Sequence, residues 1–295
     1  MTNPAIRRSM ARGRVALDLT VFLSVLAAAL MHAGWNAFVR VGLDRFSSIL
    51  LLSMTQSTLA LLLLPFVAAP APAAWPWVIA SSVLHTGYKL FLIRAYQHGD
   101  LTQIYPLARG SAPPIVALGG VLLFGEPLKP TGWLAVGLIA SGVALMALRG
   151  GAAGRLPTRA LAYALATAGF VASYTLADGQ GARIALSATA FAMWMFVGDG
   201  LCMLTYAVVT RGPKAPLAVL SEWRTGLPAG ALSLGSYWIA LWAFTRAPVA
   251  LVAALRETSV LFAMLMGVLL LKEKAGPWRW AAGLCIGAGV VAMRI

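Results

Sequence analysis

The sequence has few charged residues and almost no cysteine. Only 11% of its 295 residues are charged and 60% are hydrophobic, whereas a soluble domain carries about 25% charged residues. Cys202 and Cys285 each lie in an apolar run and offer no disulfide framework. Together with the histidines they show no metal-ligand spacing. The composition excludes an ordinary soluble protein, and we predict neither a metal nor a cofactor.

Acidic residues are also scarce. Nine of them stand against 23 lysines and arginines, which gives a net charge of +14. In a soluble protein such a surplus would suggest a nucleic-acid partner. Here the basic residues are scattered over the N-terminal tail, the loops and the predicted helix ends, without a basic-aromatic stripe. We therefore expect no nucleic-acid partner and interpret the surplus as contact with anionic headgroups of a lipid bilayer.

Signatures of membrane-embedded enzymes are missing as well. The sequence contains no HExxH, no GxSxG and no paired aspartates, which are patterns that place a metal, a nucleophile or a shared proton in an active site. We predict that the chain is not an enzyme.

Long apolar runs are abundant. They predict an all-α, polytopic membrane protein, because about 20 apolar residues make a helix that can cross a bilayer. Ten candidate spans lie near residues 18–40, 46–68, 75–97, 101–124, 131–148, 158–178, 187–210, 226–246, 248–271 and 277–294. Their connections are too short for a soluble domain. The start "RRSMARGR" resembles a signal peptide, but we expect a retained first span behind it.

The orientation in the membrane follows less clearly from the charges. Four arginines lie between residues 7 and 14, which favours a cytoplasmic N-terminus by the positive-inside rule. Ten spans then place the C-terminus on the same side. The later loops carry their basic excess on the opposite side, so the rule is ambiguous. We predict a multi-pass protein of the bacterial inner membrane with both termini in the cytoplasm.

The sequence repeats itself when it is shifted by 147 residues. The stretch "VLLFGEPLKPTGW" (121–133) then pairs with "VLLLKEKAGPWRW" (268–280), and Arg109 pairs with Arg256. Apolar bias alone would not align arginine, glutamate, proline and tryptophan together. We interpret the chain as two homologous five-helix halves, residues 1–148 and 156–295. Because an odd number of spans turns the second half over, the halves are predicted to be inverted repeats.

Two arginines lie inside predicted spans. Arg109 and Arg256 each stand about eight residues into a helix, so each is about 12 Å deep, from opposite faces of a core about 30 Å thick. Secondary transporters hold their substrate near the midplane between inverted repeats. Both arginines are therefore candidate substrate ligands. The structural alternative is that they neutralise a carboxylate, such as Glu257, or cap carbonyls freed by prolines.

These stretches resemble the drug/metabolite transporter superfamily, in particular its EamA-type ten-span transporters. The resemblance rests on "HAGWNAFVR" (32–40), "YPLARGSAPP" (105–114), "FGEPLKPTGWLAVGLIASGV" (124–143) and "ALRETSVLFAMLMGVLLLKE" (254–273). It implies export of amino acids, nucleobases, toxins or other metabolites, often in exchange for protons, through a central cavity. Tyr105 is a further candidate substrate ligand. The second copy departs from the first, since Val260 and Leu261 replace Pro113 and Pro114.

Polar residues of the first and third spans are further candidates. His32 and Asn36 share a helix face, with Trp35 beside them. We interpret them as substrate ligands, with hydrogen bonding to a neighbouring helix as the alternative; His32 can also exchange protons. Lys89 is too central to reach water, so we expect it to face a wet cavity. His85, one turn earlier, fits a packing role equally well.

Two carboxylates are candidates for proton coupling. Asp199 lies near the centre of the seventh span, between two glycines, and a desolvated carboxylate can carry a proton. Its alternative is an ion pair with Lys89 or an arginine. Glu257 is the second candidate. Glu126 and Glu273 end their helices before prolines, and we interpret them as structural connectors to the following helices.

The cationic candidates outnumber the two carboxylates, which favours an amino-acid-like or organic-anion substrate. The predicted function is a secondary active exporter of such a small metabolite by alternating access, with the proton as candidate coupling ion. The alternatives are a multidrug exporter of cationic compounds with the same fold, a membrane-embedded enzyme and a non-transporting receptor. The sequence leaves the oligomeric state open.

Overall fold

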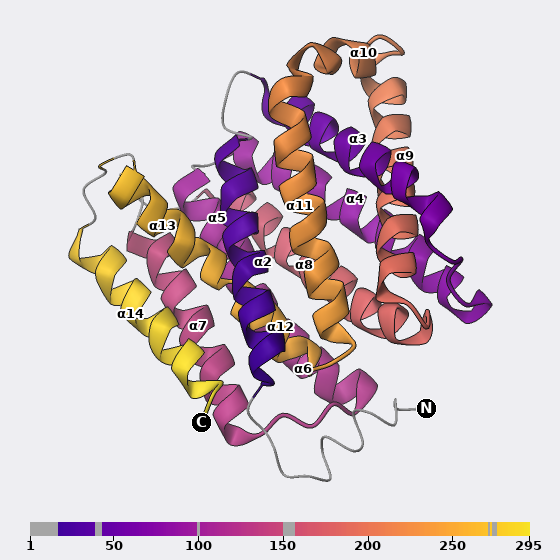
Figure 1. Cartoon of the computed structure of the whole chain (residues 1–295). Coiled ribbons are helices and arrows are strands. Elements are labelled where there is room, and N and C mark those ends of the chain that lie inside the picture. Colours follow the sequence, from indigo (N-terminus) through magenta and orange to yellow (C-terminus); the bar gives the residue numbers. More distant parts are fainter. Residues whose placement is uncertain (1–16, 39–42, 99–100, 150–156, 271, 273–275) are drawn as a thin grey trace.

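The computed structural model describes residues 17–38, 43–98, 101–149, 157–270, 272 and 276–295, which form helices joined by short connections (Figure 1). Seven of these helices are long and apolar enough to cross a membrane, and Pro130–Met146 is a shorter apolar one. Large apolar side chains such as Leu122 and Leu269 are 78% and 72% exposed, as expected where they face lipid. The protein is an all-helical, multi-pass membrane protein. The count of ten spans stays a prediction.

The helices follow the predicted spans in order. The first half holds α2 (Leu19–Phe38), α3 (Arg45–Leu63), α4 (Trp75–His98), α5 (Leu101–Gly110), α6 (Ala112–Phe124) and α7 (Pro130–Arg149). The second half holds α8 (Thr158–Ile184), α9 (Ala188–Arg211), α11 (Trp223–Phe244), α12 (Val249–Arg256), α13 (Thr258–Leu270) and α14 (Pro277–Ala292). The connections contain η1 (Leu64–Phe66), η2 (Pro72–Ala74), α10 (Ala215–Val219) and η3 (Leu220–Glu222).

The fourth predicted span is broken just after its arginine. Arg109 lies in the last turn of α5, which ends at Gly110, and α6 begins at Ala112. Pro113 and Pro114 then fall in the first turn of α6, where a missing N–H group costs little because it would have no partner in the helix. The break therefore places the prolines where a helix tolerates them.

The ninth predicted span is broken at the equivalent position without any proline. Arg256 ends α12 and Thr258 begins α13. The N–H of Glu257 donates to the carbonyl of Ala254 at 3.0 Å, which is the tight turn of a helix end. Each arginine thus lies at the carboxyl end of a half-helix, where the helix dipole favours a cation.

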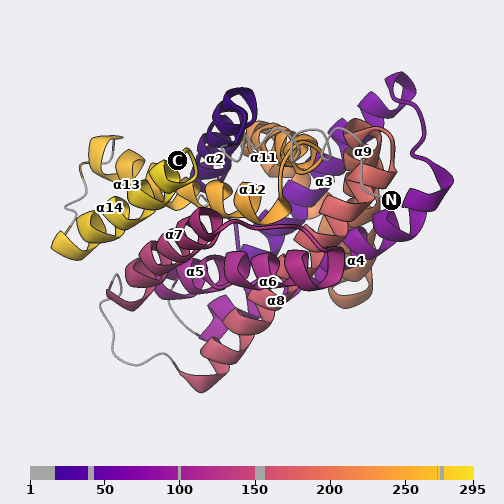
Figure 2. The ribbon, with the colours of Figure 1, turned by 90° about the horizontal axis from the view of Figure 1, so that it is seen from below.

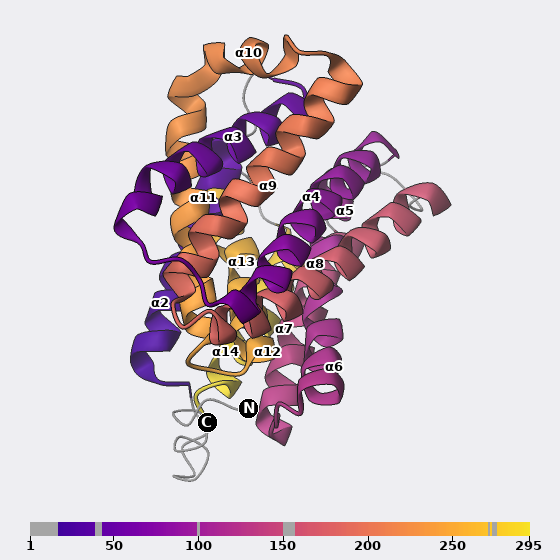
Figure 3. The ribbon, with the colours of Figure 1, turned by 90° about the vertical axis from the view of Figure 1, so that its right-hand side faces the viewer.

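The two halves interlock. The first helix of each half packs against the third helix of the other, so α2 contacts α11 and α8 contacts α4. The second helices pack against one another as α3 and α9, and the fifth helices as α7 and α14. Figure 3 shows the pairs α3–α9 and α4–α8, and Figure 2 shows α7 beside α14. This exchange of equivalent contacts is what a pseudo-twofold axis between two repeats produces.

Helices α7 and α14 run in opposite directions and approach closely at two equivalent glycines (Figure 1). A Cβ atom on Gly142 would lie 2.8 Å from the carbonyl oxygen of Ala282, and one on Gly289 would lie 2.9 Å from that of Ala135. The two contacts exchange under the shift of 147 residues. The repeat found in the sequence is therefore a symmetry of the helix packing.

Asp44 and Arg211 join the ends of α3 and α9. Oδ1 of Asp44 accepts a hydrogen bond from the N–H of Phe46 at 3.0 Å and so caps α3. Nη1 of Arg211 lies 3.1 Å from Oδ2 of Asp44. Burial raises the pKa of Asp44, but hydrogen bonds from Arg211 and Ser47 outweigh burial and lower that pKa to about 2.

Candidate functional site

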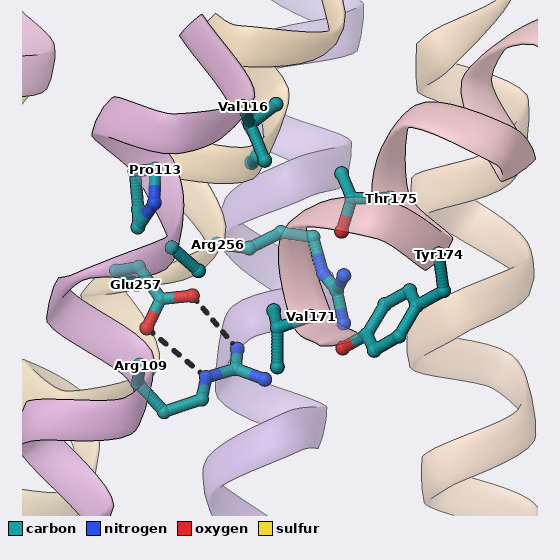
Figure 4. A pocket seen from close by; sticks show the side chains of 10 residues that line it. Arg109, Pro113, Val116, Val171, Tyr174, Thr175, Arg256 and Glu257 are labelled. Atoms are coloured by element: carbon teal, nitrogen blue, oxygen red, sulfur yellow. Dashed lines mark hydrogen bonds and ion pairs between the residues drawn. The ribbon is translucent and has the colours of Figure 1, made fainter. Parts of the chain in front are cut away.

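A small cavity lies between the two helix breaks (Figure 4). Its volume is about 10 Å³, which is roughly the space that one water molecule needs. Its polar lining consists of Arg109, Tyr174, Thr175, Arg256 and Glu257. The other lining residues are alanine, valine and proline side chains from α6, α8 and α12. Two predicted substrate ligands and one predicted coupling carboxylate therefore meet at one place.

Arg109 and Glu257 form a bidentate ion pair between the two halves. Nε of Arg109 donates to Oε2 of Glu257 at 3.1 Å, and Nη2 lies 2.8 Å from Oε1. Both side chains are buried. Figure 4 shows the pair among the side chains that line the cavity. Removing either partner would leave a buried charge without a counter-charge. The geometry therefore fits the structural alternative, in which Arg109 neutralises a carboxylate.

Arg256 has a different environment from Arg109, its counterpart in the repeat. It is 5% exposed, and within the described part of the chain its Nε has no hydrogen-bond partner and no carboxylate pairs with it. Its guanidinium carbon lies 4.7 Å from the ring centre of Tyr237, and in Figure 4 it points toward Tyr174. A buried guanidinium without a paired anion is costly.

The candidates on α2 hydrogen-bond one another. Nε1 of Trp35 donates to Nδ1 of His32 at 3.3 Å, and Nδ2 of Asn36 donates to the carbonyl oxygen of His32 at 2.8 Å. The side chain of Asn36 is thus turned toward its own helix. His32 is buried and lies within electrostatic reach of Arg109 and Arg256. The structure places His32 close to the cations of the cavity.

Lys89 and Asp199 belong to a second polar cluster, between α3, α4 and α9. They form a buried ion pair. Nζ of Lys89 also donates to Oγ of Ser53 at 2.7 Å, and Oγ1 of Thr86 donates to Oδ1 of Asp199 at 3.3 Å. None of these four residues lines the cavity described above. Lys89 is thus paired with Asp199, which was the structural alternative to a role of Asp199 in proton coupling.

The glycines beside Asp199 explain how three helices meet there. A Cβ atom on Gly198 would lie 2.3 Å from Oγ of Ser82 in α4, and one on Gly200 would lie 2.3 Å from Cβ of Ser57 in α3. Neither contact leaves room for a side chain. The sequence "GDG" therefore lets α9 approach both neighbours at the depth of the ion pair.

Sequence reasoning misses Asp178, because the predicted sixth span stops at residue 178 whereas α8 continues to Ile184. The longer helix places Asp178 inside the protein, where it is 0% exposed. Its Oδ2 lies 3.0 Å from Nε2 of His85 and accepts a hydrogen bond from the hydroxyl of Tyr237. The ring of His85 stacks on Tyr174 with centroids 3.9 Å apart. The available signal was the absence of proline between residues 178 and 184.

Glu126 and Arg183 connect the two halves at another point, through an ion pair. Nε of Arg183 donates to the carbonyl of Phe244 at 2.9 Å, and Nη2 donates to that of Ala247 at 3.0 Å. Oε2 of Glu126 accepts from the N–H of Val249, the first residue of α12, at 3.0 Å. Glu126 is thus a connector, but the helix that it caps is α12 and not the following α7.

Two residues named from the sequence cannot be placed in this way. The side chain of Tyr105, in α5, and the whole of Glu273 lie outside the described residues. Among those that are described, no group of three or more His, Cys, Asp or Glu residues is arranged to hold a metal ion. Chemically, the described residues offer a buried guanidinium whose Nε has no hydrogen-bond partner, and buried carboxylates that contact basic side chains.

Comparison with known proteins agrees with the repeated architecture. The family described as "EamA-like transporter family" matches the chain twice, over residues 19–148 and 158–295. A solved structure described as "Crystal structure of protein" is similar with a TM-score of 0.72 and 17% identity, over 93% of this chain and 98% of that chain. At this identity the likeness shows the fold alone. No curated protein matches the chain.

Proposed function

The chain belongs to the EamA-like transporter family, and on this premise we propose that it is a secondary active transporter of a small metabolite that carries a carboxylate. Amino acids and other organic anions are the substrate class. The two halves expose the cavity in turn to each side of the membrane, and the proton is the coupling ion. The domains are the two repeats, residues 1–148 and 156–295.

The single observation that carries the substrate class is the different environment of the two equivalent arginines. Arg109 is neutralised by Glu257, and Lys89 in the second cluster is neutralised by Asp199. Arg256 lines the same cavity, and among the described residues no carboxylate forms an ion pair with it, so its positive charge is retained. A substrate carboxylate supplies the missing anion and forms charge-assisted hydrogen bonds with the guanidinium.

The helix breaks support alternating access. A cavity of about 10 Å³ is far smaller than the roughly 300 Å³ of a typical ligand pocket, so substrate entry requires the lining helices to separate. The breaks between α5 and α6 and between α12 and α13 lie beside the cavity in both halves. A helix that is already interrupted can bend there without losing further backbone hydrogen bonds.

Thermal stabilisation of the detergent-purified protein tests the proposal. Wild type and Arg256→Gln are heated with a panel of amino acids, dicarboxylates, nucleobases and quaternary ammonium compounds. A ligand at 100 times its Kd adds about 2.7 kcal/mol, which is measurable. We expect a carboxylate to stabilise the wild type but not Arg256→Gln.

Arg211→Gln is the matched control, because it also removes an arginine but from the partly exposed pair with Asp44. Its stabilisation by the same carboxylate should equal that of the wild type. Stabilisation of the wild type by quaternary cations alone, without competition from carboxylates, would contradict the proposed substrate class.

A further inference from the structure

We propose that Asp178 and His85 form a buried proton-binding pair that is coupled, through Tyr237, to the anion site at Arg256. The inference rests on the proposed function, because it assigns the coupling proton of that transporter to a place. The place differs from the two carboxylates that the sequence suggested, Asp199 and Glu257.

The first step is that Asp178 is buried and that His85 is its one basic partner among the residues that the structure describes. Within the described segments, Asp199 is paired with Lys89, Glu257 with Arg109 and Glu126 with Arg183. Asp178 accepts hydrogen bonds at Oδ2 from His85 and Tyr237, and its Oδ1 has no hydrogen-bond partner among these residues. A fully buried carboxylate needs a compensating positive charge. Here a proton on the imidazole or on the carboxylate supplies it.

The second step is that this pair lies one aromatic ring away from the cavity. Tyr237 donates to Asp178 through its hydroxyl, while the guanidinium carbon of Arg256 lies 4.7 Å from the centre of the same ring. On the other side His85 stacks on Tyr174, which lines the cavity. An anion bound at Arg256 and a proton bound by Asp178 and His85 would therefore be close together. Their electrostatic interaction is strong because the protein interior screens charges poorly.

The third step is the balance of the remaining charges on the helices packed against α8. These elements are α4, α5, α6, α9, α11, α12 and the short η2, which has no titratable residue. Near the pair or the cavity they carry Tyr88, Lys89, Arg109, Asp199, Tyr237, Arg256 and Glu257, besides His85 and, on α8 itself, Tyr174. Two ion pairs neutralise four of these groups. Arg256 is the cation that remains to act on Asp178 and His85.

The sign of the coupling follows from this balance. Uptake of one proton makes the pair one unit more positive, so an anion at Arg256 binds more tightly when the proton is present. By linkage, the anion strengthens proton binding by the same factor. The proton is taken from water, held between carboxylate and imidazole, and released on the other side. An anionic substrate and the proton therefore cross the membrane in the same direction, which differs from the export in exchange for protons that the resemblance implies. A cationic substrate would be exchanged for the proton.

Histidine NMR tests the proton site without any substrate. The chain has three histidines, so the ring signal of His85 can be assigned in the purified, isotope-labelled protein with His32→Gln and His98→Gln. The signal is followed over about pH 5 to 8. We expect the His85 signal to change with pH. In Asp178→Asn the midpoint of this change should need an at least tenfold higher proton concentration, because the carboxylate that attracts the proton is gone.

Arg256→Gln tests the coupling and has the opposite expected sign. Because this variant removes a cation that repels the proton, the proton concentration needed at the midpoint should fall about threefold or more. The control Arg211→Gln lies at the ends of α3 and α9, remote from the pair, and should leave the midpoint unchanged. If Asp178→Asn does not fold, Tyr237→Phe replaces it. That variant removes a donor to the ionised carboxylate, so it lowers the required proton concentration.

A His85 signal that ignores pH, or a midpoint that neither Asp178→Asn nor Tyr237→Phe moves, overturns the proton site. An Arg256→Gln midpoint equal to that of Arg211→Gln overturns the coupling. Because no substrate is added, these failures leave the proposed transport of carboxylates standing. Conversely, a panel in which no carboxylate stabilises the protein would contradict the proposed function. The pH dependence expected for the His85 signal would not change.

Discussion

Arg109 and Glu257 form an ion pair that joins the first half of the protein to the second, with two contacts at 3.1 and 2.8 Å. The equivalent arginine, Arg256, faces an aromatic ring instead. The repeat thus places two arginines symmetrically, and one acid residue beside the second break makes them chemically different. Arg109 joins the halves at the cavity through Glu257, whereas the Nε of Arg256 has no hydrogen-bond partner among the described residues.

Removal of Arg109 should destabilise the protein more than removal of Arg256. Arg109→Gln leaves Glu257 buried without its cation, which costs about 3–5 kcal/mol. The double variant Arg109→Gln/Glu257→Gln should recover much of this loss, because no charge is then left bare. Thermal unfolding in detergent measures both. Equal losses in the single and double variants would show that the ion pair is not the cause.

The contact between α7 and α14 gives a symmetric prediction. Gly142→Ala and Gly289→Ala each place a Cβ atom within 3.0 Å of a backbone oxygen, so the helices must separate at a cost of about 1–3 kcal/mol. Gly137→Ala and Gly287→Ala are the matched controls in the same two helices, because nothing lies within 4 Å of a Cβ atom there. In thermal unfolding, Gly142→Ala and Gly289→Ala should have a lower Tm than the two control variants. Controls that lose as much stability would contradict the packing described.

The repeat and the order of the helices follow from the sequence, because apolar runs of about 20 residues and a similarity at a shift of 147 residues can be recognised in the sequence itself. Side-chain partners do not follow, because they depend on how each helix is rotated against its neighbours. The sequence predicts a wet cavity at Lys89, whereas the structure places Asp199 of α9 against it. The predicted sixth span ends at Asp178, whereas α8 continues to Ile184 and places this carboxylate inside the protein.

The second polar cluster should act as a structural unit. Lys89→Gln leaves Asp199 buried without a cation, and we expect a loss of about 3–5 kcal/mol that Lys89→Gln/Asp199→Asn largely restores. If the structural interpretation holds, the double variant also retains the pH dependence of transport in proteoliposomes. Loss of that dependence in a folded double variant would return the coupling role to Asp199.

The link between α3 and α9 should weaken only in strong acid. The pKa of Asp44 is lowered to about 2 in the folded protein, so its stabilising contribution is present above the ordinary carboxyl pKa of about 4 and is lost as the pH falls toward 2. The difference in Tm between wild type and Asp44→Asn should stay constant from about pH 7 to pH 5 and shrink below about pH 4. A difference that grows on acidification would contradict the sign.

Counterflow in proteoliposomes tests the central claim most directly, with the carboxylate that stabilises the purified wild type as the labelled probe. Wild type and Arg211→Gln should accumulate the probe equally. Arg256→Gln is first shown to be folded by its Tm and elution volume. Its counterflow should be about 10- to 100-fold slower, which is the loss expected for charge-assisted hydrogen bonds. Wild-type counterflow by folded Arg256→Gln would contradict the account.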